Sequence, residues 1–522
     1  MSSSMTSAAP TDAAEHRTPE HTSPVQTASE HSGSRNSTAT NPSAGHSPKP
    51  QSLRAAWPAL LALCLTMLVE MMDNSVLNVA LPTIGRDLGA SPTDLQWIVG
   101  AYSLTFGGLL MVGGTLGDKI GRRRTLLIGL GLFGAAGLGV LLAHSPAQLI
   151  AVRAALGAFA ALIAPLTMSL IFRLFDDDGL RHRAIGLIVT VSMIGFALGP
   201  TLSGLAVEHM PWQWLVVLNA PMALIAWVGV RWGIQPDRPE DRRTGGTDIP
   251  GALLSVAALG LILYSFTLGT EQGWTSTGTL LTAAAGLLAL GGFVWREKTT
   301  ADPMLDLSLL TLPTVRGSAL LQTAVTVAMA GAMFASTQLF QFAWGWEPWR
   351  AGLANLPFVV GMLGASPLVD ALVARWGHRR TAAVGSALVV VSLVLWVAGV
   401  GTGYLLCAVA MLVMTVGMRI IMTTGAVALI NALPEDHTSI GSAMNDTAQE
   451  LGTAFGVALI GTVTAAVVGS HLPQGAWSAA LSAQFVHAQQ ISFWVLAGIV
   501  VVMAAIGVRT LTDSTSTDEH EG

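Results

Sequence analysis

The sequence predicts an all-α membrane protein with fourteen transmembrane helices, and two observations support this prediction. Only 11% of the 522 residues are charged and 52% are hydrophobic, whereas a soluble domain carries about a quarter charged residues. From residue 57 onward, apolar stretches of about 18 to 25 residues recur, and each is long enough to cross a hydrocarbon core of about 30 Å as a helix. We therefore expect the bilayer to surround the folded chain.

The charged residues are unevenly placed and exclude several functions. Seven lie in the first 50 residues and five in the last 14, so the 458 residues between them carry only 45. The net charge of −5 gives no support for a nucleic-acid partner. Cys64 and Cys407 both lie in apolar stretches, so we expect neither a disulfide nor a zinc site. No Walker-type glycine loop or nucleophile elbow is present, so we expect no cofactor and no enzyme activity.

The expected spans follow one another with short polar connections. The first 52 residues are rich in Ser, Thr, Ala, Pro and His and contain almost no large apolar residues, so we expect a disordered tail there. The fourteen expected spans are 57–80, 95–117, 125–143, 147–171, 184–207, 212–232, 249–268, 278–295, 316–342, 351–374, 381–399, 403–430, 438–468 and 490–508.

The positions of Lys and Arg predict the orientation in the membrane. With the N-terminus inside, 22 of the 26 basic residues lie in inner segments, and the outer loops hold only Arg86 and Arg350. Cytoplasmic loops of membrane proteins carry such an excess of basic residues. We therefore expect a multi-pass protein of the cell membrane with both termini in the cytoplasm.

The first six and the last six spans have comparable loop layouts. Each set places a basic loop between its second and third helices, GDKIGRRR (117–124) and ARWGHRR (374–380). Weak internal repeats of this kind are typical of two-lobed secondary transporters. The expected segments are a cytoplasmic tail (1–52), an N-terminal six-helix lobe (53–232), a linker with two inserted helices (233–300), a C-terminal six-helix lobe (301–508) and a cytoplasmic tail (509–522).

Ionisable residues inside a span are costly to place and are functional candidates by default, and six of them stand out. Two pairs of acids are spaced three and four residues apart, which places each pair on one face of its helix. The six residues are Glu70, Asp73, Arg153, Arg419, Asp446 and Glu450.

Two carboxylates in a low-dielectric cavity repel each other when both are ionised, so one of them tends to hold a proton. Such a group can take a proton on one side of the membrane and release it on the other, or it can attract an organic cation. The alternative is structural, because buried acids also pair with arginines to hold helices together. We favour the functional interpretation for Asp73, Asp446 and Glu450, and both remain open for Glu70.

Amide side chains add further polar candidates within the spans. Asn74 and Asn78 lie one turn apart, and we include Asn78 among the candidate binding residues. For Asn219 we favour a hydrogen bond between helices.

Two glycine-containing motifs suggest moving or closely packed parts. In GTLGDKIGRRR (114–124), the spacing of Gly114, Asp118, Gly121 and Arg122 is more particular than membrane anchoring requires. This spacing suggests a hinge whose ion pairs form in only one conformation.

The second motif is GFALGPTLSG (195–204). It places Gly195, Gly199 and Gly204 on adjacent turns with Pro200 in the middle of a span. Small residues allow close helix approach, and a proline bends the helix.

With these motifs, the chain resembles the major facilitator superfamily, and within it the fourteen-helix drug:proton antiporters of the EmrB/QacA type. The resemblance covers residues from about 55 to 508. The similar segments are DNSVLNVALP (73–82), GTLGDKIGRRR, RAALGAFAA (153–161), GFALGPTLSG, WQWLVVLNAP (212–221) and GSAMNDTAQELGTAFGVA (441–458).

The resemblance implies a major-facilitator fold with two six-helix lobes plus two inserted helices, and proton-coupled efflux of amphipathic, cationic drugs by alternating access. It implies a proton-coupling role for Arg153, ion pairing between Asp118 and Arg122, and cation or proton binding by Asp446 and Glu450. The implied partners are the drug, protons and the lipid bilayer, with no obligate protein partner.

Two other functions remain open. The first is a dedicated exporter of one endogenous metabolite or antibiotic, in which Arg419 would bind an anionic group. The second is a membrane receptor that binds without transporting, which the intact hinge motif disfavours because such two-state elements serve conformational cycling.

Overall fold

The computed structural model describes residues 52–175, 177–238, 248–300, 303, 307–432, 438–469 and 477–511. The expected tails lie outside these residues except for residue 52 and residues 509–511, and so do residues 239–247 of the expected linker. The described helices belong to one compact unit, Lys49–Gly522, and no strand occurs in the described ranges. The all-α prediction is confirmed.

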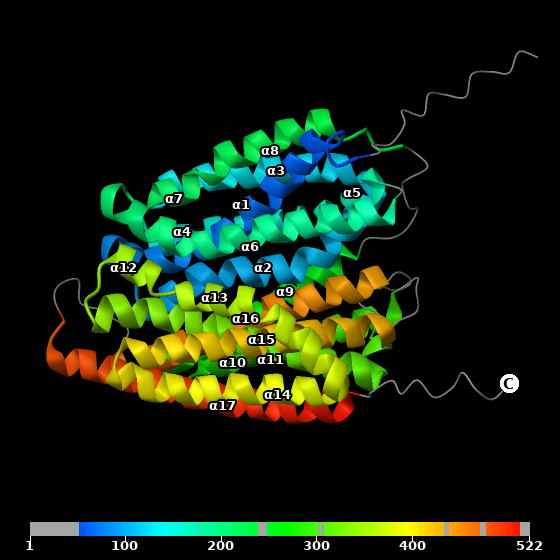
Figure 1. The fold of residues 1–522 in the computed structure, drawn as a ribbon. Coiled ribbons are helices and arrows are strands. Elements are labelled where there is room, and N and C mark those ends of the chain that lie inside the picture. The colour runs from blue at the N-terminus through cyan, green and yellow to red at the C-terminus, as the bar shows by residue number, and fades with distance from the viewer. Residues whose placement is uncertain are drawn as a thin grey trace, which may run out of the picture. The chain divides into compact units, whose positions relative to one another are not determined.

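The first six expected spans are built from eight α-helices (Figure 1). Two of these spans are broken, one before Pro165 and one at Leu218, three residues before Pro221. A proline lacks the N–H that continues a helix and is accommodated in a first turn. The helices are α1 (Trp57–Leu88), α2 (Pro92–Ile120), α3 (Arg122–Leu138) with the 3-10 turn η1 (Gly139–Leu142), α4 (Pro146–Ala160), α5 (Ala164–Leu174), α6 (Asp178–His209), α7 (Gln213–Val217) and α8 (Asn219–Gly233).

The rest of the chain contains the expected inserted pair, α9 (Ile249–Gln272) and α10 (Thr277–Thr299), and the last six spans. These spans comprise η3 (Leu309–Thr311), α11 (Pro313–Gln338), the π-helix η4 (Leu339–Ala343), α12 (Pro348–Leu353), α13 (Leu356–Gly364), α14 (Ser366–Thr402), α15 (Tyr404–Ala432), α16 (Thr438–Val468) and α17 (Ala479–Thr510).

Thirteen helices among the described residues are long and apolar enough to cross a membrane. The remaining expected span, 351–374, is divided among α12, α13 and the start of α14, because Pro357 and Pro367 each begin a new helix. The expected basic loop 374–380 lies inside α14, where Gly377 has a φ of 74° and marks a kink.

The helices form two groups, which we call the N-half (α1–α8) and the C-half (α11–α17). In the N-half, α1 packs on α6 and α8, and α2 packs on α4; in the C-half, α14 packs on α15 and α11 packs on α16 and α17. Figure 1 shows the N-half helices above those of the C-half. The two halves meet where α2 packs on α16 and α6 packs on α12.

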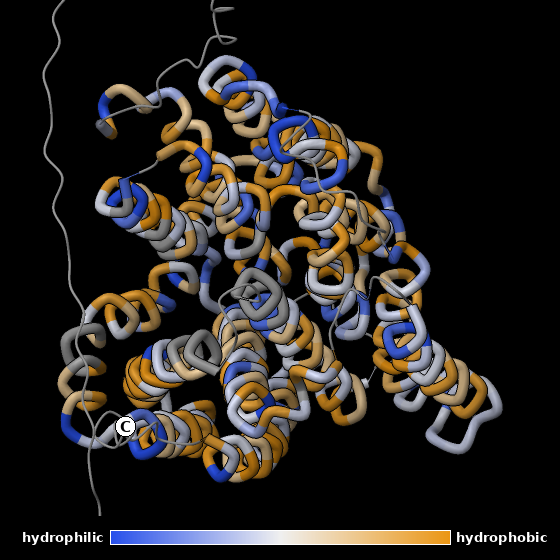
Figure 2. Tube along the Cα trace, turned by 90° about the vertical axis from the view of Figure 1, so that its right-hand side faces the viewer, coloured by the Kyte–Doolittle hydropathy of each residue, from blue (hydrophilic) through white to orange (hydrophobic). Residues whose placement is uncertain are grey.

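Hydrophobic residues recur along the helices of both groups (Figure 2). Inside a bilayer the hydrophobic effect does not drive helix association, so close packing through small residues takes its place. A Cβ added to Gly113 of α2 would lie 1.8 Å from the Ala161 oxygen, and one added to Gly157 of α4 would lie 2.2 Å from the Tyr102 oxygen. The backbones of α2 and α4 are therefore in direct contact.

Candidate functional site

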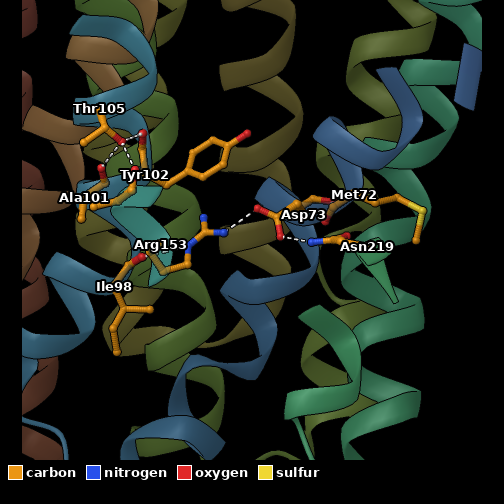
Figure 3. A network of polar contacts seen from close by, with 10 residues as sticks. Met72, Asp73, Ile98, Ala101, Tyr102, Thr105, Arg153 and Asn219 are labelled. Carbon is orange, nitrogen blue, oxygen red and sulfur yellow. Dashed lines mark hydrogen bonds and ion pairs between the residues drawn. The ribbon is translucent and has the colours of Figure 1, made fainter. Parts of the chain in front are cut away.

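Asp73, in the middle of α1, has a partner at each of its carboxylate oxygens. Arg153 of α4 donates from Nη1 to Asp73 Oδ2 at 2.5 Å, and Asn219, the first residue of α8, donates from Nδ2 to Oδ1. Figure 3 shows Arg153 and Asn219 approaching the carboxylate from opposite sides. All three side chains are buried, so this carboxylate is neutralised and oriented within the N-half.

Arg153 is held by more than the ion pair. Its side chain is 1% exposed, and its Nε donates to the Ile98 carbonyl oxygen at 3.1 Å. Its guanidinium lies 4.4 Å from the centroid of the Tyr102 ring, which is within the range of a cation–π interaction (Figure 3). The contacts of this one arginine connect α1, α2 and α4.

Glu70 and Glu450 are acids of a different kind. Glu70, one turn before Asp73, is 4% exposed, and its Oε2 has no hydrogen-bond partner among the described residues. The Oε2 of Glu450 on α16 is likewise buried and without a partner in the described chain. Glu450 packs on α2, because a Cβ added to Gly107 would lie 2.8 Å from the Glu450 Cβ. Glu450 therefore lies where the halves meet, and its charge acts on Glu70 in the other half.

The intramembrane acids form one electrostatic group. The charges of Glu450, Asp446 and Asp73 all act on Glu70. Asp446, one turn before Glu450, is exposed, whereas Glu70 is buried. Arg153 neutralises Asp73, so Glu70 and Glu450, whose Oε2 atoms are buried, need a proton or an incoming cation to avoid the cost of an unpaired buried charge.

The structure brings together five of the six residues predicted for coupling and binding, from α1, α4 and α16. The sixth, Asn78, lies just over one turn beyond Asp73 on α1 and is half-buried. The five are Glu70, Asp73, Arg153, Asp446 and Glu450.

Sequence reasoning missed part of the site. The hydrogen bond expected of Asn219 is observed, but its acceptor is Asp73, so this residue belongs to the site. The sequence feature that could have indicated this role is the position of Asn219 two residues before Pro221, where a new helix begins. Tyr102 carries no such signal, because its neighbours in the sequence are those of any packed span. Arg419 of α15 is half-buried, its Nε has no partner in the described chain, and it contributes to none of these contacts.

The predicted hinge lies at the junction of α2 and α3. Arg122 and Asp118 form an ion pair at 2.9 Å, and Gly121 between the two helices has a φ of 118°. A Cβ added to Gly121 would lie 2.5 Å from Asp237 Oδ2, so glycine is required for both conformation and space. Gly114, by contrast, would tolerate a Cβ at 3.8 Å from Pro165.

Asp237, which follows α8, is a further residue that the sequence did not reveal. It accepts hydrogen bonds from the backbone N–H groups of Arg123 (3.2 Å) and Arg124 (3.0 Å). It also accepts from Arg173 Nη1 at 2.8 Å. The carboxylate therefore satisfies free N–H groups at the start of α3 and ties α3, α5 and the end of α8 together.

The second basic loop shares with the first a glycine of positive φ, but it lacks the residues of the ion pair. Gly377 has a positive φ, as Gly121 does. Ala374 and His378 occupy the positions of the acid and the arginine of the ion pair.

Each basic loop also holds the last helix of its own half. Arg123 Nε donates to the Val230 oxygen of α8 at 3.4 Å, and Arg379 Nε donates to the Val508 oxygen of α17 at 3.1 Å. The weak repeat seen in the sequence is thus a repeat of helix contacts.

The glycines of the 195–204 motif make two different contacts. Added Cβ atoms at Gly195 and Gly199 would collide with α1, the second at 1.9 Å from Ser75 Oγ. One added to Gly204 would lie 2.4 Å from the Pro348 oxygen of α12. This motif therefore packs α6 both within the N-half and against the C-half.

Two further contacts between the halves lie on the same side of the acids as the contact between Gly204 and Pro348. The Pro200 oxygen of α6 would lie 2.4 Å from a Cβ added to Gly352 of α12. Gln341 of η4 donates from Nε2 to the Val79 oxygen of α1 at 2.8 Å. These contacts lie between the acids and the end of the spans at which α1 finishes and α2 begins.

The sequence profile of the Major Facilitator Superfamily matches residues 63–457. The chain is 31% identical over 477 residues to the puromycin resistance protein pur8 of Streptomyces alboniger, covering 89% of this chain and 93% of that protein. It is 31% identical over 411 residues to the methyl viologen resistance protein SmvA of Salmonella typhimurium, covering 78% and 82%. It is 32% identical over 420 residues to the cephamycin export protein CmcT of Amycolatopsis lactamdurans, covering 78% and 85%.

Solved structures share the fold at low sequence identity. A bacterial homologue of the human lysosomal transporter Spinster superposes with a TM-score of 0.63 at 14% identity, covering 87% of this chain and 97% of that one. The nucleoside transporter NupG superposes with a TM-score of 0.60 at 13% identity, covering 87% and 100%. Both comparisons show a shared arrangement of helices.

Proposed function

The chain belongs to the Major Facilitator Superfamily and is a drug efflux transporter, and we propose that it couples export to the inward movement of protons. The observation that carries the coupling is the burial of Glu70 and Glu450 without a compensating cation in the described chain. A buried carboxylate in this situation must be protonated or must bind a cation from outside the protein. Proton and substrate then compete for the same negative charge.

Competition between protons and the drug for the same carboxylates gives the proposed transport cycle. In the proposed sequence, Glu450 and the exposed Asp446 release their protons on the cytoplasmic side and attract an amphipathic cation. After the halves rock to open the site outward, protonation of these acids removes the charge that held the cation, and it leaves. Asp73 and Arg153 stay paired throughout because both lie in the N-half. Glu70 adds a second site for a proton.

We propose that the halves are the two lobes that move, 53–232 and 301–508, with 233–300 as the linker and inserted pair and both termini in the cytoplasm. The orientation rests on the excess of basic residues in the segments between α2 and α3 and inside α14. With that orientation, the contacts of Gln341 and Gly352 lie on the outer side, which supports the proposal of a state closed to the outside. The Asp118–Arg122 pair would act as the latch of one of the two states.

The proposed substrates are amphipathic organic cations. Four clustered acids with one arginine leave the site negative when the acids are ionised. One relative is named for resistance to methyl viologen and another for resistance to puromycin. A negative pocket in a low-dielectric setting favours cations over neutral analogues of the same size.

The test uses purified protein in proteoliposomes with an imposed proton gradient and ethidium as the probe. Wild type should concentrate ethidium only while the gradient persists, and Glu450→Gln should lose this transport. Glu208→Gln, an exposed acid at the end of α6, is the matched control and should behave as wild type. Ethidium transport that survives both a protonophore and Glu450→Gln would refute proton coupling through this site.

A second candidate is a dedicated exporter of one antibiotic. It is favoured by relatives named as a tetracenomycin C resistance and export protein and as a cephamycin export protein. A panel of chemically unrelated compounds in an efflux-deficient host separates the two, because a dedicated exporter protects against one compound class and a multidrug exporter against several.

A further inference from the structure

The inserted pair occupies a particular place beside the contact between the halves. The outer helix α10 packs on α9 and is the least buried of the candidate spans. The inner helix α9 packs on both α2 and α16. Since α2 belongs to the N-half and α16 to the C-half, α9 lies along a seam between the two.

Adjacent faces of α2 contact α16 and α9. Gln96 and Gly107 face α16, where an added Gly107 Cβ would lie 2.8 Å from the Glu450 Cβ. Their next neighbours in the sequence, Trp97 and Gly108, face α9. Because consecutive residues on a helix are separated by about 100°, α9 flanks the seam and does not fill it.

Polar contacts fasten α9 to α2 at one end. Trp97 Nε1 donates to Thr267 Oγ1 at 3.0 Å, and Thr93 Oγ1 donates to Glu271 Oε1 at 3.1 Å. Hydrogen bonds between helices are a main source of cohesion where no water competes.

The same pair of helices is fitted together further along. Ser255 Oγ donates to the Gly108 oxygen at 3.4 Å, and a Cβ added to Gly108 would lie 2.4 Å from Val256 Cγ2. From Thr93 to Gly108 the contact covers fifteen residues of α2, which is about 22 Å of helix. The α2–α9 contact therefore extends over most of the hydrocarbon thickness.

The contact of α9 with α16 has a different character. Leu263 of α9 meets Ala454 and Ala458 of α16 in a small apolar cluster of its own, with Trp97 and Phe455 against it. Among the hydrogen bonds formed by described residues, none joins α9 to α16. Two alanines one turn apart offer a smooth surface, and lateral movement along it breaks no polar contact.

We propose that the inserted pair moves with the N-half and slides over α16 as a seal along the α2–α16 seam. When the seam opens, α9 would keep lipid away from Glu450, which faces α2 one turn before Ala454. This inference rests on the proposed function, because it requires the halves to part during transport.

Engineered cross-links test which helix α9 follows, in a background of Cys64→Ala and Cys407→Ala. Gly108→Cys with Val256→Cys joins α9 to α2, and the two Cβ positions are 3.5 Å apart, as a disulfide requires. Leu263→Cys with Ala454→Cys, joined through two disulfides by a short bis-methanethiosulfonate reagent, ties α9 to α16. Proton-driven ethidium transport is measured in inside-out vesicles before cross-linking, after it and after reversal by a reductant.

The first cross-link should leave transport unchanged, and the second should reduce it on the order of tenfold or more, with recovery on reversal. Recovery excludes misfolding as the cause. Transport that is blocked by the first cross-link, or that survives the second, would overturn the sliding seal.

A third pair, Gln96→Cys with Thr462→Cys, crosses the seam itself, where the two side-chain oxygens lie 3.5 Å apart. This cross-link should block transport if the halves part here. If transport survives it, alternating access at this seam is wrong, and the proposed function fails with it. If it blocks transport while the second cross-link does not, only the sliding seal fails.

Discussion

Asp73 and Glu70 lie one turn apart on α1 and are equally buried, yet their surroundings differ completely. Asp73 faces α4 and α8 of its own half, and both of its oxygens are bonded. The charges of the acids of α16 in the other half act on Glu70, and its Oε2 has no partner in the described chain. In this structure the charge of Asp73 is neutralised within its own half, whereas Glu70 has no cation beside its buried oxygen among the described residues.

The largest effect on stability is expected when Arg153, the cation that pairs with Asp73, is removed. Arg153→Leu should lower the free energy of unfolding in detergent micelles by about 3–5 kcal/mol, because Asp73 is left charged and unpaired in the interior. Adding Asp73→Asn should restore much of this loss. Arg350→Leu, which removes an exposed arginine of α12 whose guanidinium lies over the Trp346 ring, serves as the control. A double variant no more stable than the single one would show that the charge of Asp73 is not the cause.

The next effect concerns the amide that completes the pair. Asn219→Leu keeps the side-chain size but removes the donor to Asp73 Oδ1, and it should lower the free energy of unfolding by about 1.5–3 kcal/mol. Denaturant unfolding in detergent micelles measures this loss of unfolding free energy. Pairing this change with Asp73→Asn should give less than the sum of the two effects, since both act on one bond. Full additivity would mean that Asn219 acts elsewhere.

A smaller loss is expected at the ring that faces the guanidinium. Tyr102→Leu removes the cation–π contact with Arg153 and should lower the free energy of unfolding by about 0.5–2 kcal/mol. Tyr102→Phe should be nearly neutral, because the hydroxyl has no hydrogen-bond partner among the described residues. Equal losses in both variants would contradict an interaction through the ring.

The smallest effect on stability is expected on the unpaired side. Glu70→Gln removes no bond, so we expect a change in unfolding free energy below about 0.5 kcal/mol. Transport of ethidium should nonetheless depend less steeply on the proton gradient, because one protonation site is lost. A large destabilisation with normal proton dependence would reverse the roles assigned to Glu70 and Asp73.

Much of the fold was predictable because membrane spans are encoded locally. The expected span 438–468 coincides with α16, although Asp446 and Glu450 interrupt its apolar run. The span 351–374 was harder to predict, because its apolar composition outweighed the helix starts signalled by Pro357 and Pro367. Composition reports what the bilayer accepts, and backbone geometry decides where a helix breaks.

The chemistry of the site divides in the same way. Helical spacing was enough to place Glu70 with Asp73 and Asp446 with Glu450 on shared faces. Helical spacing could not predict which acid pairs with Arg153, because that depends on which helices become neighbours.

By itself, the sequence determined the membrane environment, most of the spans and the small set of charges within them, because these follow from the cost of polar groups in lipid. Tertiary structure alone decided that Asn219 and Arg153 complete Asp73, that Asp237 holds the start of α3, and that Oε2 of Glu70 and Oε2 of Glu450 have no hydrogen-bond partner among the described residues. Hydrogen bonds and ion pairs form over a few ångströms, and the packing of helices distant in sequence determines which groups come that close.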